Sequence, residues 1–499
     1  MSVEIYDRKA WLEKHRSVKT LWHHVAIGRR TLDSVNIWPE SAMLDGCDAH
    51  QREQWSKATT GAVGILGGSP GTGKTFTVAS GVRAIIATGL VDPQLIGIGA
   101  PTGKAAVRLT EQLQAAGLDM RARTWHSLLG VGAADGEFKH NRRNPLPHRV
   151  LIGDESSMLA TDMMRSIFAA RARGCHFLLV GDVNQLPPVN HGAPLRDLIA
   201  AGLPYGELTE IKRNSGGIVE ACAAIRDGKA WVCGDNLKLL HTSAPQEQLE
   251  TVVAVSHRVG SMGLDPIWDS QVLVAVNAKS KVSRAAINAV LQEQLNPNGQ
   301  GMKGCSFRVK DKIVNTKNGY FTAIDTDANP DDITQNERGE VYVANGELGE
   351  VIAIEDKLLI VRLSGPVRVV KVPRGPVSTR AKSADDDSDA ERETSESGDD
   401  KPTATGCSWE LGYALSVHKS QGSEVPVAIV VLDEYPGARM ICDRSWLYTA
   451  ISRAKRKCIL VGAKATADAM CRRANIGKRK TFLRELVLSG LADCAMKGL

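Results

Sequence analysis

The sequence has none of the features that mark a secreted, membrane-spanning or metal-stapled protein. Its 10 cysteines are scattered singly and no CxxC pair occurs, so they indicate neither a zinc knuckle nor a disulfide framework. No apolar run approaches the roughly 20 residues of a membrane-spanning helix, and no signal peptide is recognisable. We therefore expect a cytoplasmic protein in a reducing compartment, without a membrane partner.

The strongest concentration of negative charge lies in one segment. Residues 385–400 carry nine acidic residues and a single arginine, so the rest of the chain is nearer about +14 than the overall +6. A basic body with one segregated acidic tract indicates a polyanionic partner. Solubility alone is the alternative explanation, and charge by itself does not decide between the two.

Short apolar runs alternate with helical patterns along a chain of 499 residues, which is long enough for two to four domains. Each run ends in small or polar residues, where a parallel strand would pass into a loop. This alternation is typical of open α/β sheets that carry their site at the strand ends. The first set of runs occupies 62–66, 95–99, 149–155 and 175–182, and the second occupies 270–276, 427–432 and 457–462.

Composition divides the chain further. Between members of the second set lies a stretch of short alternating strands with Gly and Asp turns, which predicts a small inserted barrel. A Ser/Asp/Glu-rich tract follows that cannot bury enough apolar surface to fold. The predicted parts are a short N-terminal region at 1–45, a first α/β domain at 46–205, a second α/β domain at 206–304 and 407–465, the barrel at 305–375, a disordered acidic loop at 376–406 and a helical, basic tail at 466–499.

The segment GSPGTGKT, from Gly68 to Thr75, fits the pattern G-x-x-x-x-G-K-[ST] and follows an apolar run, the context a phosphate-binding loop requires. Glycines let backbone amides curve around phosphate oxygens. Lys74 is expected to reach the β- and γ-phosphates, and the Thr75 hydroxyl to hold Mg²⁺. We therefore predict ATP and Mg²⁺ as cofactors, bound by Gly68, Pro70, Gly71, Thr72, Gly73, Lys74 and Thr75.

A second apolar run, VLIGDESSM, ends in the acidic pair Asp154 and Glu155. Asp154 suits an outer contact to Mg²⁺, and Glu155 is placed to polarise an attacking water. Most acidic pairs are solvated surface, but at the end of a buried strand after a P-loop the pair favours hydrolysis over a purely structural nucleotide site.

A further run is followed by GDVNQLPPV, in which the amide of Gln185 could sense the γ-phosphate. The alternative is a polar turn held by Pro187 and Pro188, and the sequence leaves both interpretations open.

Further segments resemble superfamily 1 helicases, and their pattern is most similar to the RecD-like branch, which translocates 5′→3′ and includes phage Dda. Gln51, in HQREQW, lies where that family has an adenine-reading glutamine. The other matching segments are APTGKAA (100–106), RTWHSLLG (123–130), ELTEIKRN (207–214), ALSVHKSQGSE (414–424) and WLYTAISRAKRK (446–457), which occur in family order and cover most of 51–462.

The resemblance implies an α/β fold of two RecA-like P-loop domains. It adds a small β-hairpin at about 130–149 as a strand-separating wedge, and an SH3-like barrel in the second domain. It also implies that Arg213 and Arg453 neutralise γ-phosphate charge and that Glu424 contributes to the nucleotide site. An arginine of this kind typically contributes about 10³- to 10⁵-fold in rate. A surface arginine is the alternative for each.

The strand-contacting motifs of the family supply the predicted DNA-binding residues. Hydroxyl and imidazole groups can bond phosphate and sugar without reading sequence, and Trp125 and Trp409 could stack on bases. For the aromatic rings and both histidines a place in the core is the alternative. The predicted residues are Thr102, Lys104, Thr124, Trp125 and His126 in the first domain and Ser416, His418 and Lys419 in the second.

Several features depart from the family. An Asn follows Arg213 where a Gln is usual, and the acidic insertion at 376–406 has no match; it is a spacer or a mimic of nucleic acid. The short N-terminal region suits a compact enzyme, such as one from a phage or mobile element, more than docking into a large recombination complex.

The sequence therefore predicts an ATP-dependent DNA helicase that acts on single-stranded DNA and on single-strand/duplex junctions. Replication or recombination proteins are possible partners. An RNA helicase, a nucleic-acid-gated ATPase that does not unwind and the motor half of a nuclease or relaxase remain alternatives, although no nuclease motif is visible.

Overall fold

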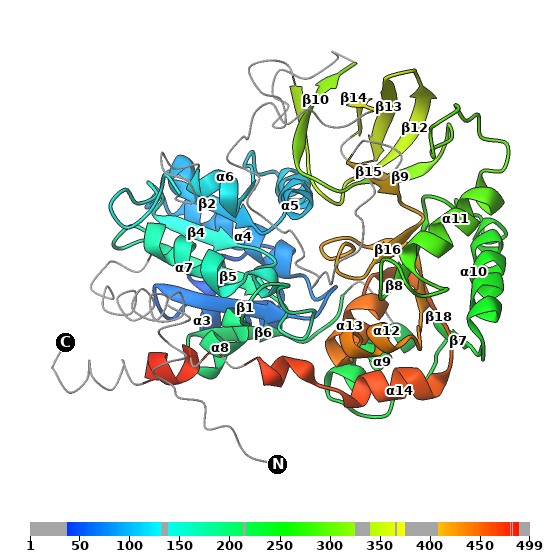
Figure 1. The fold of residues 1–499 in the computed structure, drawn as a ribbon. Helices are drawn as coiled ribbons and strands as arrows, with labels where there is room; N and C mark the ends of the chain where they lie inside the picture. Colours follow the sequence, from blue (N-terminus) through cyan, green and yellow to red (C-terminus); the bar gives the residue numbers. More distant parts are fainter. Residues whose placement is uncertain are drawn as a thin grey trace, which may run out of the picture. The chain divides into compact units, whose positions relative to one another are not determined.

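The computed structural model describes residues 37–130, 138–212, 216–324, 340–364, 367–374, 408–479, 481 and 483–488. The chain divides into two compact units (Figure 1). Unit 1 comprises Met1–Lys212 and Asn475–Leu499, and unit 2 comprises Arg213–Ala474. The predicted acidic loop at 376–406 lies outside the described residues, as do 131–137 of the predicted hairpin. Within the described ranges, no helix is both long and apolar enough to cross a membrane.

Unit 1 is built on a six-stranded sheet in the order β3-β2-β4-β5-β1-β6, and every pairing in it is parallel. The apolar runs that predict the first α/β domain all form strands here. The strands are β1 (Val63–Gly68), β2 (Ile96–Ala100), β3 (Arg123–Thr124), β4 (Val150–Gly153), β5 (His176–Gly181) and β6 (Tyr205–Leu208).

Alternation along these strands sends successive side chains to opposite faces of the sheet. In β5, Phe177 and Leu179 enter one core cluster and Leu178 and Val180 enter the other. A sheet that is apolar on both faces must be covered by helices on both. The helices are α3 (Ala49–Ala58), α4 (Lys74–Ala87), α5 (Gly103–Ala115), α6 (Trp125–Leu129), α7 (Thr161–Ala170) and α8 (Pro194–Ala200).

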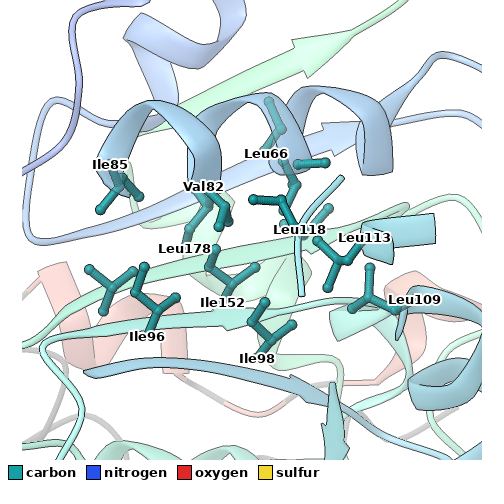
Figure 2. Packing of buried hydrophobic residues seen from close by; sticks show 14 of the residues in the cluster. Leu66, Val82, Ile85, Ile96, Ile98, Leu109, Leu113, Leu118, Ile152 and Leu178 are labelled. Carbon is teal, nitrogen blue, oxygen red and sulfur yellow. The ribbon is translucent and has the colours of Figure 1, made fainter. Parts of the chain in front are cut away.

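Figure 2 shows the cluster on the face covered by α4 and α5. Val82 and Ile85 from α4, with Leu109 and Leu113 from α5, pack on Ile98, Ile152 and Leu178 of the sheet. These contacts fix the beginning of α4 over the end of β1, which is where the phosphate-binding motif lies.

Unit 2 contains a second all-parallel sheet, in the order β16-β8-β17-β18-β7. The three apolar runs of the second predicted set supply β8 (Ser270–Val274), β17 (Val425–Val431) and β18 (Ala454–Val461). The remaining strands are β7 (Leu237–Leu240) and β16 (Ala414–Ser416). The helices are α9 (Gly217–Arg226), α10 (Pro245–Gly260), α11 (Arg284–Leu295), α12 (Pro436–Ile441), α13 (Arg444–Ile451) and α14 (Lys464–Arg472).

A seven-stranded sheet, antiparallel at every pairing, is inserted into unit 2 in the order β11-β10-β14-β13-β12-β9-β15. The β-rich character expected for 305–375 is therefore confirmed, while its classification as SH3-like stays a prediction. The strands are β9 (Lys312–Asn315), β10 (Gly319–Ala323), β11 (Glu340–Val343), β12 (Leu348–Ile354), β13 (Leu358–Ser364), β14 (Val367–Pro373) and β15 (Trp409–Leu411).

A buried polar network fixes this insertion to the parallel sheet of unit 2. The Asp311 carboxylate, fully buried, accepts hydrogen bonds from Asn296 at 2.8 Å and from the Tyr413 hydroxyl at 2.9 Å. Lys312, also buried, donates from Nζ to the carbonyls of Ile267 at 2.7 Å and Ser270 at 3.0 Å. Burial without such partners would be costly, so the network holds the two sheets of unit 2 in one arrangement.

The C-terminal part of the chain differs from the single tail expected at 466–499. Its first helix, α14, belongs to unit 2, but the chain from Asn475 onward belongs to unit 1. The 3-10 turn η4 (Asn475–Lys478) comes first, and Leu483, Leu486 and Val487 then enter the core of unit 1 beside α7 and α8. These buried side chains explain why the segment leaves unit 2.

Candidate nucleotide site and strand-contact elements

The loop between β1 and α4 has the geometry expected of a phosphate-binding loop. Gly71 and Gly73 have φ values of 80° and 86°, a left-handed conformation that favours glycine. The Thr72 hydroxyl donates to the Ser69 carbonyl at 2.8 Å and closes the turn. The loop ends at the N-terminus of α4, a 14-residue helix whose first amides and dipole favour an anion.

Lys74 lies against this loop. Its Nζ donates to the carbonyls of Gly68 at 2.7 Å and Ser69 at 3.1 Å. The ammonium group is therefore already held at the loop, where the phosphates of a nucleotide would meet it.

Gln51 reaches the same loop from α3. Its backbone amide and side-chain oxygen form a capping box with Asp48, at 2.8 Å and 3.2 Å. A Cβ on Gly73 would lie 2.6 Å from Gln51 Nε2, so the amide nitrogen borders the P-loop. The structure thus places the predicted adenine-reading glutamine beside the predicted phosphate site.

The end of unit 1 is also tied to the loop. The Lys212 amide donates to the Gly71 carbonyl at 2.8 Å, and its ammonium pairs with Asp48 at 2.7 Å and Glu210 at 2.8 Å. Arg213 is the next residue along the chain and lies outside the described residues. Sequence reasoning missed this link because backbone hydrogen bonds leave no signal in side-chain identity.

The acidic pair follows β4. The Asp154 amide donates to the Gly99 carbonyl at 2.9 Å, and the Asp154 carboxylate accepts from the Glu155 amide, also at 2.9 Å. Glu155 has a φ of 48°, an uncommon conformation for a residue that is not glycine. Burial and the neighbouring Glu155 carboxylate raise the pKa of Asp154 to about 6, while Lys74 and Arg108 oppose the rise.

Gln185 lies in the loop after β5, the strand between β4 and β1 (Figure 1). Three adjacent strands therefore end at the acidic pair, at Gln185 and at the P-loop. The Gln185 amide donates to the Asp182 carbonyl at 3.2 Å, and the side chain is buried. The backbone hydrogen bond to Asp182 shows the turn, and a role of the Gln185 side chain at the γ-phosphate stays a prediction.

Thr102 and Thr124 are the N-cap residues of α5 and α6. Their hydroxyls accept from the amides of Ala105 at 3.3 Å and Ser127 at 3.1 Å. The strands before them are neighbours, with Ala100 paired to Thr124. Capping uses the acceptor capacity of a hydroxyl and leaves its proton for a phosphate or sugar oxygen.

The structure favours the core interpretation of Trp125. Its side chain is fully buried, and a Cβ on Gly99 or Gly153 would lie 2.6 Å or 2.9 Å from the indole. The ring also packs edge-on against Phe177. A ring enclosed in this way has no free face for a base. The other two predicted DNA-binding residues here, Lys104 on α5 and His126 on α6, are half-buried.

Trp409 is enclosed as well, in the core of the antiparallel sheet of unit 2 beside Phe321. Its 1% exposure favours the core interpretation here too. The apolar content of a strand does not say whether an aromatic ring on it faces a core or a groove, which is why the sequence left both open.

Ser416, His418 and Lys419 follow β16 in unit 2. The Ser416 hydroxyl accepts from the Lys419 amide at 3.3 Å, and both His418 and Lys419 are half-buried. Lys419 Nζ lies 3.8 Å from the Glu410 carboxylate, which accepts from Arg284 at 2.6 Å. Sequence reasoning missed Glu410, because an acidic residue beside a buried tryptophan carries no motif of its own.

Arg453 is buried and held by three nitrogens within unit 2. It donates to the carbonyls of Thr449 at 3.1 Å and Ser423 at 3.2 Å and to the Ser452 hydroxyl at 3.0 Å. Glu424, the last residue of the preceding motif, lies 3.8 Å from the Lys455 ammonium. The two motifs nearest the C-terminus therefore contact each other directly.

Two family models match this chain. An AAA domain matches residues 51–191, and a UvrD-like helicase C-terminal domain matches 411–461. The first match contains the P-loop, the acidic pair and Gln185. The second contains Ser416, His418, Lys419 and Arg453.

Several curated proteins are related along most of the chain. It is 30% identical over 427 residues to the ATP-dependent RecD2 DNA helicase of Deinococcus radiodurans, an alignment that covers 85% of this chain and 50% of the relative. It is 29% identical over 486 residues to the RecBCD enzyme subunit RecD of Mycolicibacterium smegmatis, covering 90% of this chain and 76% of that one. The chain therefore spans about half the length of the Deinococcus relative.

Two further similarities are shorter or more distant. The ATP-dependent DNA helicase dda of Enterobacteria phage T4 is 30% identical over 173 residues, 33% of this chain and 38% of that protein. Among solved structures, Pif1 helicase from Bacteroides matches 81% of this chain and 90% of its own, with 18% identity and a TM-score of 0.44, too distant to carry an argument. The helicase motifs occur in family order, both family models match, and the RecD relatives align along most of the chain. The chain therefore belongs to the RecD-like superfamily 1 helicases.

Proposed function

We propose that this protein is an ATP-dependent DNA helicase that translocates 5′→3′ on single-stranded DNA and separates duplex DNA. One observation carries the proposal: three adjacent parallel strands end at a P-loop, an acidic pair and Gln185, and the P-loop also borders Gln51. That set of groups suits nucleotide hydrolysis, and the helicase motifs of unit 2 supply a use for the energy. The names of the RecD2 and Dda relatives support DNA as the substrate.

ATP would bind with its phosphates at the P-loop amides and at the Lys74 ammonium. Thr75 and Asp154 offer the hydroxyl and carboxylate oxygens that Mg²⁺ prefers. Burial and the neighbouring Glu155 carboxylate raise the pKa of Asp154, and a cation would offset both effects. Bound Mg²⁺ would neutralise charge on the β- and γ-phosphates. Glu155 would accept a proton from the attacking water, and Gln185 would orient near the γ-phosphate.

Arginines complete the proposed hydrolytic site. Arg213 directly follows Lys212, whose amide donates to the Gly71 carbonyl of the P-loop, and it would contribute from this part of the chain. Arg453 would contribute from unit 2, and release of the γ-phosphate would remove its partner. Hydrolysis would thereby become relative movement of the two units.

DNA would be held by groups that do not read bases. The capping hydroxyls of Thr102 and Thr124, with His126 and Lys104, would serve unit 1, and Ser416, His418 and Lys419 would serve unit 2. Hydrogen bonds from such groups to phosphate and sugar position a strand irrespective of sequence. The predicted hairpin at 130–149 would separate the strands of the duplex, and the SH3-like insertion would help to cover the exiting strand.

ATP hydrolysis should be measured with single-stranded DNA, single-stranded RNA of the same sequence, or neither, with Lys74→Ala as the inactive control. We expect DNA to stimulate hydrolysis by the unaltered protein more than RNA does. Stimulation by RNA alone would support an RNA helicase instead, and absence of hydrolysis with every polymer would contradict the proposal.

A further inference from the structure

The C-terminal segment contacts the loop that begins at Gln185. The guanidinium Nη1 of Arg479 donates to three carbonyls of that loop, those of Pro188 at 2.6 Å, Asn190 at 3.1 Å and Gly192 at 3.2 Å. Arg479 is nearly 300 residues away in sequence, at the end of η4. A basic helical tail does not explain such a specific contact.

A positively charged donor suits this loop. Pro187 and Pro188 have no amide proton to donate, and the carbonyls of Pro188, Asn190 and Gly192 all accept from the same Arg479 nitrogen. The carbonyl of His191 is taken by the Thr161 amide at 3.2 Å and hydroxyl at 3.1 Å. Hydrogen bonds from a charged donor are stronger than neutral ones, so the Arg479 guanidinium is a principal stabiliser of the conformation of this loop.

The segment that carries Arg479 is itself firmly attached to unit 1. Arg196 of α8 donates to the Arg479 carbonyl at 2.8 Å and also to the carbonyl of Ile476. The Thr481 hydroxyl donates to the buried Asp197 carboxylate. A Cβ on Gly192 would lie 3.2 Å from the Thr481 methyl group. With three apolar side chains in the core beyond it, the segment is rigid enough to position another group.

Gln185 shares a small cavity with this segment. The cavity is lined by Gln185 and Pro188 of the loop, Arg196 of α8 and Ile476 of η4, among others. A displacement of η4 or of the loop therefore changes the surroundings of the Gln185 side chain directly.

The contact made by Arg479 lies close to one of the two points where the chain crosses between unit 1 and unit 2. The chain passes from unit 1 to unit 2 after Lys212 and returns after Ala474. The first passage is fixed to the P-loop by the bond from Lys212 to Gly71. The second is fixed, a few residues on, to the loop after Gln185 by Arg479. Both passages are thus anchored on elements of the nucleotide site.

We propose that Arg479 is a positioning residue for Gln185: by holding the carbonyls of the loop at 186–192, it fixes the Gln185 side chain for its part at the nucleotide site. This inference rests on the proposed function, because it assigns Arg479 a part in ATP hydrolysis. Arg479 acts through the loop at 186–192.

Three variants of the full chain test this role. Arg479→Ala removes the donor, Arg479→Lys keeps a cation, and Arg484→Ala is the matched control. Arg484 lies three residues beyond Thr481 of this segment and donates to the Ala200 carbonyl of unit 1 at 3.1 Å, away from the loop at 186–192. For each variant, ATP hydrolysis would be measured over a range of ATP concentrations with saturating single-stranded DNA, and amide hydrogen exchange would be followed at 186–192.

For Arg479→Ala we expect a loss of about 10-fold in kcat with KM for ATP changed less than about 2-fold, because misplacing a catalytic group slows the chemical step more than binding. Exchange at 186–192 should rise. Arg479→Lys should recover part of kcat, and Arg484→Ala should match the unaltered protein. In a Gln185→Ala background, Arg479→Ala should add little further loss, because the two residues act as one unit.

Three results would overturn the inference. If Arg479→Ala had the kcat of the unaltered protein, Arg479 would have no part in hydrolysis. Unchanged amide exchange at 186–192 would show that Arg479 does not hold the loop. Equal losses in Arg484→Ala would show a general effect of the tail on stability. If the unaltered protein hydrolysed no ATP, the proposed function would fail and the role in hydrolysis with it, whereas the exchange experiment would still decide whether Arg479 holds the loop.

Discussion

The amide of Lys212 donates a hydrogen bond to the carbonyl of Gly71 at 2.8 Å, which joins the last residue before the chain enters unit 2 to the phosphate-binding loop. The residue that follows, Arg213, is the one the family resemblance assigns to the γ-phosphate. The connection to unit 2 therefore begins at the nucleotide site itself. A change in the conformation of the phosphate-binding loop on nucleotide binding would therefore act directly on the hydrogen bond at the start of this connection.

Replacing Asp154 should stabilise the protein and abolish its hydrolysis. Because burial and Glu155 raise the pKa of Asp154 to about 6 from 3.8, its charged form disfavours the folded state. The difference in unfolding free energy between Asp154→Asn and the unaltered protein should be near zero at about pH 4. It should grow with pH and level off above about pH 6, at no more than about 3 kcal/mol.

Denaturant unfolding from pH 4 to pH 8 without nucleotide or Mg²⁺ would measure this difference. Glu155→Gln serves as the companion variant. Its unfolding free energy should rise less than that of Asp154→Asn, because it removes the repulsion between the two carboxylates but leaves the Asp154 carboxylate buried. A stability difference that shrank as pH rose would refute the assignment of the buried charge.

Gly73→Ala should weaken nucleotide binding. The added Cβ would lie 2.6 Å from Gln51 Nε2, at a residue with a φ of 86°. Gly89 is a matched control, with a φ of 68° and open space around its added Cβ. Both substitutions cost about 1 kcal/mol in backbone strain. Only Gly73→Ala should weaken ATP binding, by at least about 10-fold in calorimetry, and equal binding by the two variants would contradict this geometry of the loop.

Thr102→Asp should weaken binding of single-stranded DNA while the fold is kept. Aspartate caps a helix as well as threonine does, so the melting temperature should change little. The variant lacks the hydroxyl proton and adds negative charge near the phosphates, so we expect about a 10-fold loss of affinity. Thr102→Ser, which keeps both the cap and the proton, should bind as the unaltered protein does. Fluorescence anisotropy with a labelled oligonucleotide would detect either result.

Trp125→Phe should leave DNA binding unchanged, and Trp125→Ala should destabilise unit 1 by about 3–5 kcal/mol. The physical reason is that the indole fills space beside Gly99 and Gly153 in the core and has no exposed face. Chemical unfolding and DNA affinity would be measured on both variants. Loss of DNA affinity by a well-folded Trp125→Phe protein would restore the stacking role.

The sequence was sufficient for the features that depend on local pattern. Continuous apolar runs predicted β1, β4 and β5, and the glycine pattern predicted a phosphate-binding loop, in which Gly71 and Gly73 are left-handed. Features that depend on distant contacts were beyond it. The tail was predicted to be helical and basic, but its sequence does not state which core Leu483 and Leu486 enter. The same holds for Trp125, whose partners are two glycines on separate strands.

Strand separation with defined polarity tests the central claim most directly. Two partial duplexes, one with a 5′ and one with a 3′ single-stranded tail, would be incubated with ATP and Mg²⁺, and Lys74→Ala would be the inactive control. We predict ATP-dependent unwinding of the 5′-tailed duplex only. Unwinding of the 3′-tailed duplex alone would contradict the polarity, and hydrolysis stimulated by single strands without unwinding of either duplex would contradict the helicase itself.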